Sequence, residues 1–225
     1  MVMTLSDADR ALVSAAVAKA EVESDGEIVT VIAQRSDAYH DVGLHYAVLM
    51  MLLVPVWFAV VPQGWIDWVV GTFLGWNVEL SRPLVMTYMF AKQAGAFLSV
   101  WLLFKWMPLR MALTPPSTKE RRVRRRAVEI FRAGTEHRTK GRTGVLLYLS
   151  LLERRAEIVA DEAIHSKVEP EVWGEAMAVL VERGKAGQAG QGMALAVEKI
   201  GAVLAQCLPP QQENPNELSD RLIEL

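Results

Sequence analysis

The feature that most constrains this chain is a long apolar segment, residues 44–107, in the interior of the sequence. It opens with LHYAVLMMLLVPVWFAVV, Leu44–Val61, a run of 18 residues that carries no formal charge. A membrane-spanning helix needs about 20 mostly apolar residues, because each residue rises about 1.5 Å through a hydrocarbon layer about 30 Å thick. The run, extended by Pro62–Trp65 at the interface, therefore predicts one membrane span.

A second span is predicted between Leu84 and Met107, which completes a two-helix hairpin. Lys105 lies near its end, where a lysine can extend to the membrane surface, whereas Lys92 lies deeper. Residues 66–76 are apolar but too short to cross, so we interpret them as an interfacial or re-entrant piece. Six of the seven tryptophans fall in this region, mostly near the expected helix ends, where indole rings favour the headgroup level. A pair of buried helices in a soluble core is the alternative interpretation.

Charge predicts how the hairpin is oriented. Between Met107 and residue 126 the only acidic residue is Glu120, and the cationic residues are Arg110, Lys119, Arg121, Arg122, Arg124, Arg125 and Arg126. Lys and Arg near membrane ends remain in the cytoplasm, so the carboxyl-terminal region is expected there. Two passes return the chain to its starting side, which makes both termini cytoplasmic. The acidic residues Asp7 and Asp9 do not fit a secretory signal peptide.

The rest of the chain fits one soluble domain, since about 160 residues remain outside the hairpin. The formal net charge of −2 creates no global field that points to nucleic acid, so no nucleic-acid partner is expected. The single cysteine, Cys207, excludes an intramolecular disulfide and fits a reducing compartment. It lies on a predicted apolar helix face, which indicates a small core residue.

A strand-pairing argument predicts how the domain is assembled. EIVTVIA, Glu27–Ala33, is short and β-branched, which indicates a strand, but residues 1–41 offer no partner for it. Gly144–Leu152, GVLLYLSLL, is nearly continuously apolar, as a central strand covered on both faces would be. Ala156–Ala160 returns beside it as a hairpin. The sheet of this α/β domain must therefore combine strands from both sides of the membrane hairpin.

These elements set the predicted boundaries. Residues 1–41 and 110–208 form the two parts of one cytoplasmic domain, 42–109 form the transmembrane hairpin, and 209–225 form an extended, acidic carboxyl-terminal tail. Helices are expected at 5–22, 119–132, from 169 onward, and at 193–208. The Gly-rich sequence GKAGQAGQG, residues 184–192, is expected to connect the last two helices without binding phosphate, because no strand precedes it.

The cluster Arg121, Arg122, Arg124, Arg125 and Arg126 has two interpretations. We favour a membrane-surface anchor against anionic headgroups, where each charge contributes roughly 1 kcal/mol. A nucleic-acid site is the alternative. A basic cluster beside a membrane exit is already explained by the positive-inside rule, which favours the first interpretation.

The richest polar stretch, HRTKGRTG, leads directly into the predicted central strand. Cationic side chains beside glycine can hold a phosphate or carboxylate. We hypothesise an anion-binding group of His137, Arg138 and Arg142, with Asp161 and His165 as catalytic candidates, His165 being oriented by Asp161. The alternative is structural: Arg142 pairs with Asp161 across the hairpin edge and the histidines cap helices. The structural alternative is favoured because no nucleophile stands beside a base.

No metal site and no cofactor are expected. His137, His165 and Asp161 are dispersed and match no spaced ligand motif, although calcium or magnesium would be the ions to test. Asp37 and Asp41, just before the apolar segment, are expected to be ordinary solvated residues.

The order of helix, strand and hairpin, followed by FRAGTEHRTKGRTGVLLYLSLLERRAEIVADEAIHSKVEPEVW and the terminal NELSDRLIEL, resembles the TPM-domain family, specifically its bacterial membrane branch. The resemblance implies a small three-layer α/β/α sandwich and a place in the bacterial inner membrane. Some members of the family, mainly exported ones, have been credited with acid phosphatase activity or calcium binding. This chain departs from them by splitting its domain around the hairpin, and it lacks the acidic surface cluster that would carry a metal site across.

We therefore expect a multi-pass inner-membrane protein whose cytoplasmic TPM-like domain acts as a protein-interaction or scaffold module. Its expected partners are the lipid bilayer and another membrane protein or a second copy of the chain. Two alternatives are a phosphoester hydrolase of the phosphatase type at the 137–165 edge, and a subunit of a membrane transport complex that assembles through helices facing Lys92.

Overall fold

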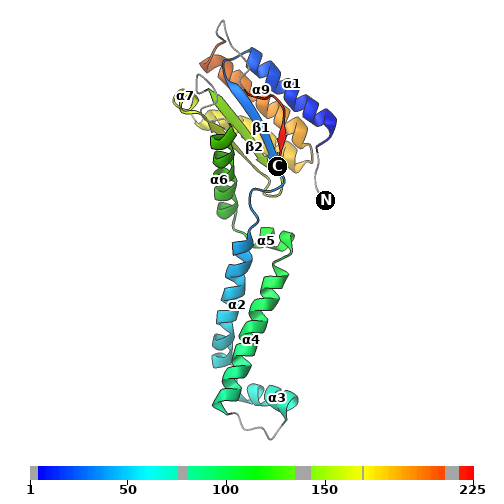
Figure 1. Ribbon diagram of the computed structural model, residues 1–225, viewed down its shortest axis with the longest axis vertical. Coiled ribbons are helices and arrows are strands. Elements are labelled where there is room, and N and C mark those ends of the chain that lie inside the picture. The colour runs from blue at the N-terminus through cyan, green and yellow to red at the C-terminus, as the bar shows by residue number, and fades with distance from the viewer. Residues whose placement is uncertain (1–4, 76–80, 135–142, 169, 211–217) are drawn as a thin grey trace. The chain divides into compact units, whose positions relative to one another are not determined.

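The chain divides into two compact units. The computed structural model describes residues 5–75, 81–134, 143–168, 170–210 and 218–225. Unit 1 comprises Met1–Ala38 and Pro115–Leu225, and unit 2 comprises Tyr39–Thr114. Unit 1 is a mixed α/β domain, and the elements described in unit 2 are helices (Figure 1).

Unit 1 is built on a four-stranded sheet with the order β3-β2-β1-β4. β1 (Glu27–Ala33) runs parallel to β2 (Gly144–Ser150), with Glu27 opposite Gly144 and Ala33 opposite Ser150. β3 (Arg155–Ala160) returns antiparallel to β2. The predicted pairing of the first strand with a strand beyond the apolar segment is therefore confirmed.

Both central strands are buried along their whole length, which accounts for their continuous apolar sequences. Alternate residues of β1 and β2 point to opposite faces and enter two separate cores. The strand residues of the first core are Ile28, Ile32, Val145, Leu147 and Leu149. Those of the second core are Val29, Val31, Ala33, Leu146 and Tyr148.

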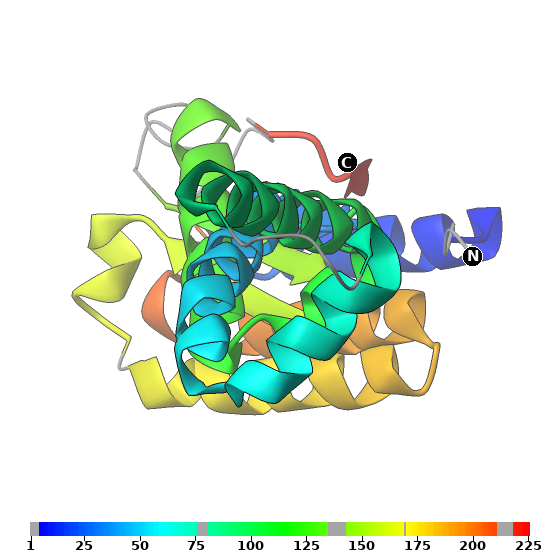
Figure 2. The same ribbon diagram turned by 90° about the horizontal axis from the view of Figure 1, so that it is seen from below.

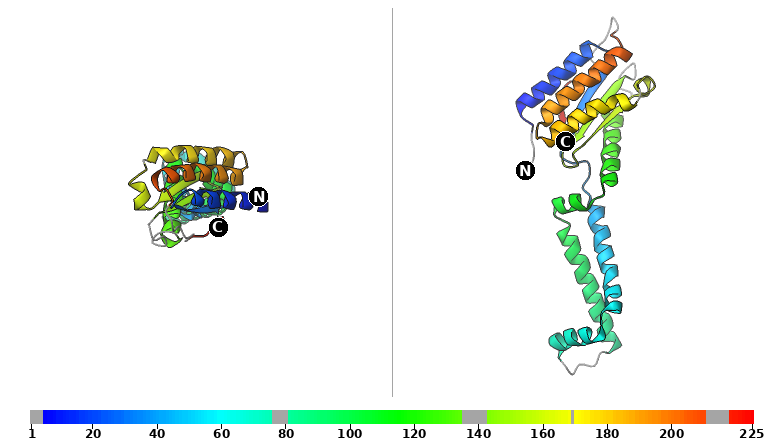
Figure 3. Two further views of the ribbon diagram at one scale, coloured as in Figure 1. Left: turned by 90° about the horizontal axis from the view of Figure 1, so that it is seen from above. Right: turned by 180° about the vertical axis from the view of Figure 1, so that it is seen from behind.

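Three helices cover the first face of the sheet: α1 (Asp7–Val22), α8 (Gly174–Lys185) and α9 (Ala189–Cys207). They lie side by side in the view from behind, and the view from below shows α8 and α9 in the same layer (Figures 2 and 3). Ser6 and Asp9 form a capping box at the start of α1, with the Asp9 N–H donating to Ser6 Oγ at 3.1 Å. The apolar sides of these three helices, which include Val17, Leu180 and Val197, fill the first core.

The Gly-rich sequence between α8 and α9 is largely helical, so its prediction as a connection was wrong. α9 begins at Ala189, and only residues 186–188 separate it from α8. A Cβ at Gly190 would lie 2.4 Å from Asp9 Cβ, and one at Gly201 would lie 2.6 Å from Ala20 Cβ. These glycines therefore allow α9 to approach α1 closely.

The second face is covered by α6 (Pro116–Gly134), whose Val123, Ala127 and Phe131 recur at helical spacing and fill the second core. α7 (Glu162–His165) and the 3₁₀ helix η1 (Pro170–Trp173) lead from β3 toward α8. The helix predicted from residue 169 therefore begins as η1 and continues as α8. Val172 of η1 is exposed, whereas Trp173 is buried.

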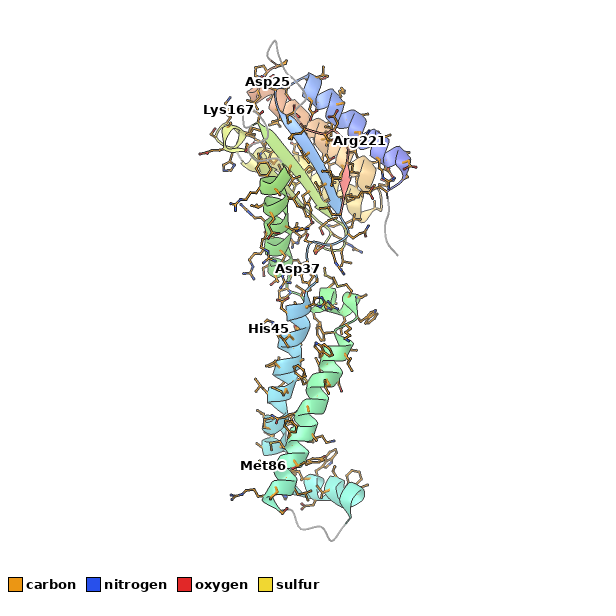
Figure 4. All side chains as sticks on the ribbon, in the orientation of Figure 1. Asp25, Asp37, His45, Met86, Lys167 and Arg221 are labelled. Atoms are coloured by element: carbon orange, nitrogen blue, oxygen red, sulfur yellow. The ribbon has the colours of Figure 1, made fainter. Side chains whose placement is uncertain are left out.

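The carboxyl terminus adds an edge strand, β4 (Ile223–Glu224), parallel to β1. The Leu225 N–H donates to Ile32 O at 2.9 Å, and the Gln34 N–H donates to Leu225 O at 3.0 Å. Arg10 Nε on α1 lies 2.6 Å from Glu224 Oε1. Figure 4 labels Arg221 on this segment, beside the sheet.

The described residues of unit 2 form four helices: α2 (His40–Val60), α3 (Gln63–Leu74), α4 (Arg82–Leu103) and α5 (Met107–Leu113). α2 and α4 pack side by side (Figures 1 and 3). A Cβ at Gly43 of α2 would lie 2.7 Å from the Cβ of Phe104, the residue that follows α4, so this glycine allows a close approach.

Arg110 closes this end of unit 2. Its guanidinium is buried and donates to the carbonyls of Phe104 and Lys105, which follow the last turn of α4. It also lies 3.1 Å from His40 Nδ1. The side chain therefore satisfies backbone acceptors that the end of α4 leaves open.

Among the described residues, one helix is long and apolar enough to span a membrane, namely α2. α4 and α5 meet the same test only together, and they are bent by 101° relative to each other. The number of helices that could span a membrane is thus one, or two if α4 and α5 form a single broken span. The predicted second span corresponds mainly to α4.

Candidate functional site

The anion site predicted before β2 is only partly within the described structure. His137, Arg138 and Arg142 lie outside the described residues. Asp161 and His165 are described, and they lie at the end of β3 and at the end of α7. Their surroundings are therefore the part of this prediction that can be examined.

Asp161 connects the end of β3 to the start of β2. Its side chain is buried, and its Oδ2 accepts the Gly144 N–H at 3.0 Å. Its own N–H donates to Gly144 O at 3.0 Å. This reciprocal pair closes the β2–β3 hairpin at the end opposite the turn, a structural role for a buried carboxylate.

His165 is exposed at the end of α7, and its backbone N–H donates to Asp161 O at 2.9 Å. The hydrogen bond made by the Asp161 carboxylate goes to Gly144, not to the histidine ring. Within the described ranges no group of three or more His, Cys, Asp or Glu side chains converges as metal ligands. The catalytic and anion-binding roles of the five residues stay predictions.

The arginine cluster lies on α6, where Arg122 is partly buried and the other four arginines are exposed. The helix carries seven cationic side chains and two acidic ones. Arg122 Nη1 and Arg125 Nη2 contact Asp37 Oδ2 at 3.2 and 3.1 Å, and Glu129 lies 3.4 Å from Arg126. Asp37 is thus half-buried in ion pairs and not simply solvated as expected (Figure 4).

Arg121 and Arg124 differ from these neighbours. Both are exposed, and neither has a carboxylate within 4 Å among the described residues. Burial raises the pKa of Glu157 on β3, and the positive charge of nearby Arg124 opposes this rise. The outer side of α6 therefore presents cationic groups that remain available to a ligand or a surface.

A buried polar cluster lies at the carboxyl ends of β1 and β2. Ser36 Oγ lies 3.0 Å from Tyr148 Oη, the Ser36 N–H donates to Glu153 Oε1 at 2.9 Å, and Ser150 Oγ donates to Glu153 Oε2. Burial raises the pKa of Tyr148, and the Glu153 charge adds to this. The cluster fixes the chain that continues from β1 toward unit 2. This cluster was not predicted from the sequence, although Ser36 and Glu153 each lie three residues beyond the end of a strand, where sites in parallel sheets commonly form.

A second group that sequence analysis missed is acidic and lies at the amino end of β1. Glu21 Oε1 accepts the Ile28 N–H at 2.9 Å, and Glu27 Oε2 accepts the Leu218 N–H at 3.1 Å. Burial raises the pKa of Glu21 to about 8, and the charges of Glu27 and Asp220 add to the effect. Asp220 lies almost 200 residues beyond Glu21 and Glu27 in the sequence, so no spacing motif could reveal this group.

Comparison with known proteins agrees with this fold. The family model described as the TPM domain matches residues 110–203. This range contains α6, the strands β2 and β3, α7, η1, α8 and most of α9. The NMR structure of BA42 protein from the psychrophilic bacterium Bizionia argentinensis is similar with a TM-score of 0.55 and 16% identity, and covers 98% of this chain and 95% of that chain. No curated protein matches. Residues 110–203 are therefore similar to the TPM domain, and the BA42 protein shares the fold.

Proposed function

We propose that this chain is a membrane-anchored interaction module. Unit 2 is a two-pass helical anchor in the bacterial inner membrane, and unit 1 is a cytoplasmic TPM-like α/β/α domain that binds protein partners at the membrane surface. The TPM domain supplies the fold, and the exposed apolar surface of unit 2 is the observation that carries the proposal.

That surface fits lipid and not a soluble core. Only 11% of the most apolar 18-residue window of α2 is buried. The outward side chains include Leu49, Leu52, Val56 and Trp57, and α4 contains no buried residue among those described. A core helix of a soluble protein would be mostly buried, because exposing this much apolar surface to water is unfavourable.

The arginines of α6 support the orientation. α6 begins at Pro116, two residues after unit 2 ends at Thr114. Exposed Arg121 and Arg124 can contact anionic headgroups at that position, where each charge contributes roughly 1 kcal/mol. Unit 1 receives both ends of unit 2, which is consistent with two passes and with both termini on the cytoplasmic side.

Site-directed labelling tests the anchor and its orientation. The natural thiol Cys207 is first replaced by serine, and single cysteines are then placed at exposed positions, Gln63→Cys in unit 2 and Glu23→Cys in unit 1. A membrane-impermeant maleimide should label Gln63→Cys in intact spheroplasts and Glu23→Cys only after permeabilisation. Equal labelling at both positions, or release of the chain by alkaline carbonate, would refute the proposal.

Phosphoester hydrolysis is the second candidate, and the name of the matching family model, TPM_phosphatase, is what favours it. The test is hydrolysis of generic phosphoester substrates by the detergent-purified chain, with and without magnesium or calcium. Activity that both His165→Ala and Arg142→Ala abolish would assign an enzyme site to the predicted 137–165 edge. Activity that both variants retain would refute that site.

A further inference from the structure

An apolar groove of about 860 Å³ runs between α2 and α4 in unit 2. Its walls include Leu53, Val54 and Trp57 of α2 and Ala91, Gly95 and Ala96 of α4. A Cβ added at Gly95 would meet no neighbouring group within 4 Å, so this wall is open. The groove therefore has room for the side chains of another helix.

Lys92 is the one cationic residue in the wall of this groove. Its ammonium lies 5.1 Å from the centre of the Tyr88 ring, and no carboxylate lies within 4 Å of it among the described residues. Lys92 is ten residues from Arg82 and eleven from Leu103. At about 1.5 Å per residue, it is therefore about 15 Å from either end of α4.

We propose that this groove is the docking site for a transmembrane helix of another membrane protein, and that the helix carries an Asp or Glu near mid-bilayer that pairs with Lys92. The inference rests on the proposed membrane anchor. A charge at that depth is costly unless it is paired, and a carboxylate on a helix seated in the groove would supply the missing partner.

Charge selects this occupant over two others. A second copy would bring Lys92 toward Lys92, and its α2 and α4 carry no acidic residue except Asp41 in the first turn of α2. A lipid acyl chain would fit the apolar walls, but a lipid phosphate lies at the headgroup level, about half the roughly 30 Å hydrocarbon thickness away from Lys92. A partner helix with its own Asp or Glu can both pack against the apolar walls of the groove and pair with the Lys92 ammonium.

The first experiment uses a defined probe. The full chain in lipid nanodiscs is titrated with a fluorescent Leu/Ala transmembrane peptide that carries one central Glu, and with the same peptide carrying Leu there. The Glu peptide should bind about tenfold more tightly, a typical effect of one polar pair between membrane helices. Lys92→Met should abolish the difference, whereas Lys105→Met, at the far end of α4, should preserve it. Equal binding of both peptides to the wild-type chain would overturn the proposal.

Charge reversal and native crosslinking complete the test. Lys92→Glu should reverse the preference, so that a peptide with a central Lys binds more tightly than the Glu peptide. A photoreactive residue at Gly95 in native membranes should crosslink to a transmembrane segment containing Asp or Glu, and Lys92→Met should remove that adduct. Adducts with a second copy or with lipid alone would overturn the proposal. Alkaline extraction of the same membranes distinguishes the two proposals. A chain that stays in the membrane but binds the Glu peptide no more tightly than the Leu peptide would refute docking and leave the membrane anchor supported.

Discussion

Glu21 allows a sharp test of the energetics of unit 1. Its side chain is 8% exposed, it accepts the Ile28 N–H through one oxygen, and it faces the carboxyl groups of Glu27 and Asp220. The substitution Glu21→Gln keeps an acceptor for Ile28 and removes the ionisable proton. It should therefore leave the fold intact and change only how stability depends on pH.

The sign follows from linkage. The pKa of Glu21 is raised from 4.5 to about 8 in the native state, so the native state holds a proton that the unfolded chain releases. Stability from this group is complete below pH 4.5 and is lost as the pH rises toward 8. At about 1.4 kcal/mol per pH unit, the loss has a ceiling of about 5 kcal/mol. Local release of residues 218–225 would let water reach the Glu21 carboxylate and would make this loss of stability smaller.

The assay is urea unfolding of the full chain in detergent between pH 5 and 9, followed by far-UV circular dichroism. Glu21→Gln should match the wild type at pH 5 and exceed its free energy of unfolding by several kcal/mol at pH 9, with about 5 kcal/mol as the ceiling. Glu23→Gln, an exposed neighbour on the same turn, is the control. Parallel curves for wild type and Glu21→Gln across this range would refute the reasoning.

Three further substitutions test packing and charge in unit 1 by the same unfolding assay. Thr30→Val should stabilise by about 1 kcal/mol, because Thr30 Oγ1 is buried without a hydrogen-bond partner among the described residues; a loss of stability would contradict this. Gly201→Ala should destabilise by about 1–3 kcal/mol through its clash with Ala20, while Gly184→Ala, in open space, should not destabilise. Asp37→Ala should cost about 1 kcal/mol at low salt and less at high salt, since its ion pairs with arginine are partly exposed. A salt-independent cost would contradict the ion-pair account.

The sequence alone predicted the elements whose signals are local. The seven residues of β1 and the start of β2 were placed correctly because β-branched and continuous apolar runs mark buried strands. The helix expected at 5–22 likewise corresponds to α1, which begins after a capping box at Ser6. The pairing of these two strands followed indirectly, from the rule that an isolated strand cannot satisfy its backbone groups, whereas their parallel orientation is known only from the structure.

Contacts between distant segments required the tertiary structure. Gly190 belongs to a stretch that resembles a flexible connection in sequence, yet it lies within α9, where α1 approaches too closely for a side chain. Asp37 was expected to be solvated, but the position of α6 brings Arg122 and Arg125 into ion pairs with it. For Asp161 the sequence left a catalytic role and a favoured structural role open, and only the structure shows that its carboxylate accepts the Gly144 N–H of β2.

The sequence by itself determined that this chain combines a long apolar segment with an α/β domain drawn from both sides of it. Hydrophobic runs and strand periodicity report how each residue is solvated, which is a local property. The tertiary structure alone decided which charged groups meet: the Glu21, Glu27 and Asp220 carboxyls, the Asp37 ion pairs, and the groove beside Lys92. Those encounters depend on distances between segments far apart in the chain, and no periodicity in the sequence encodes them.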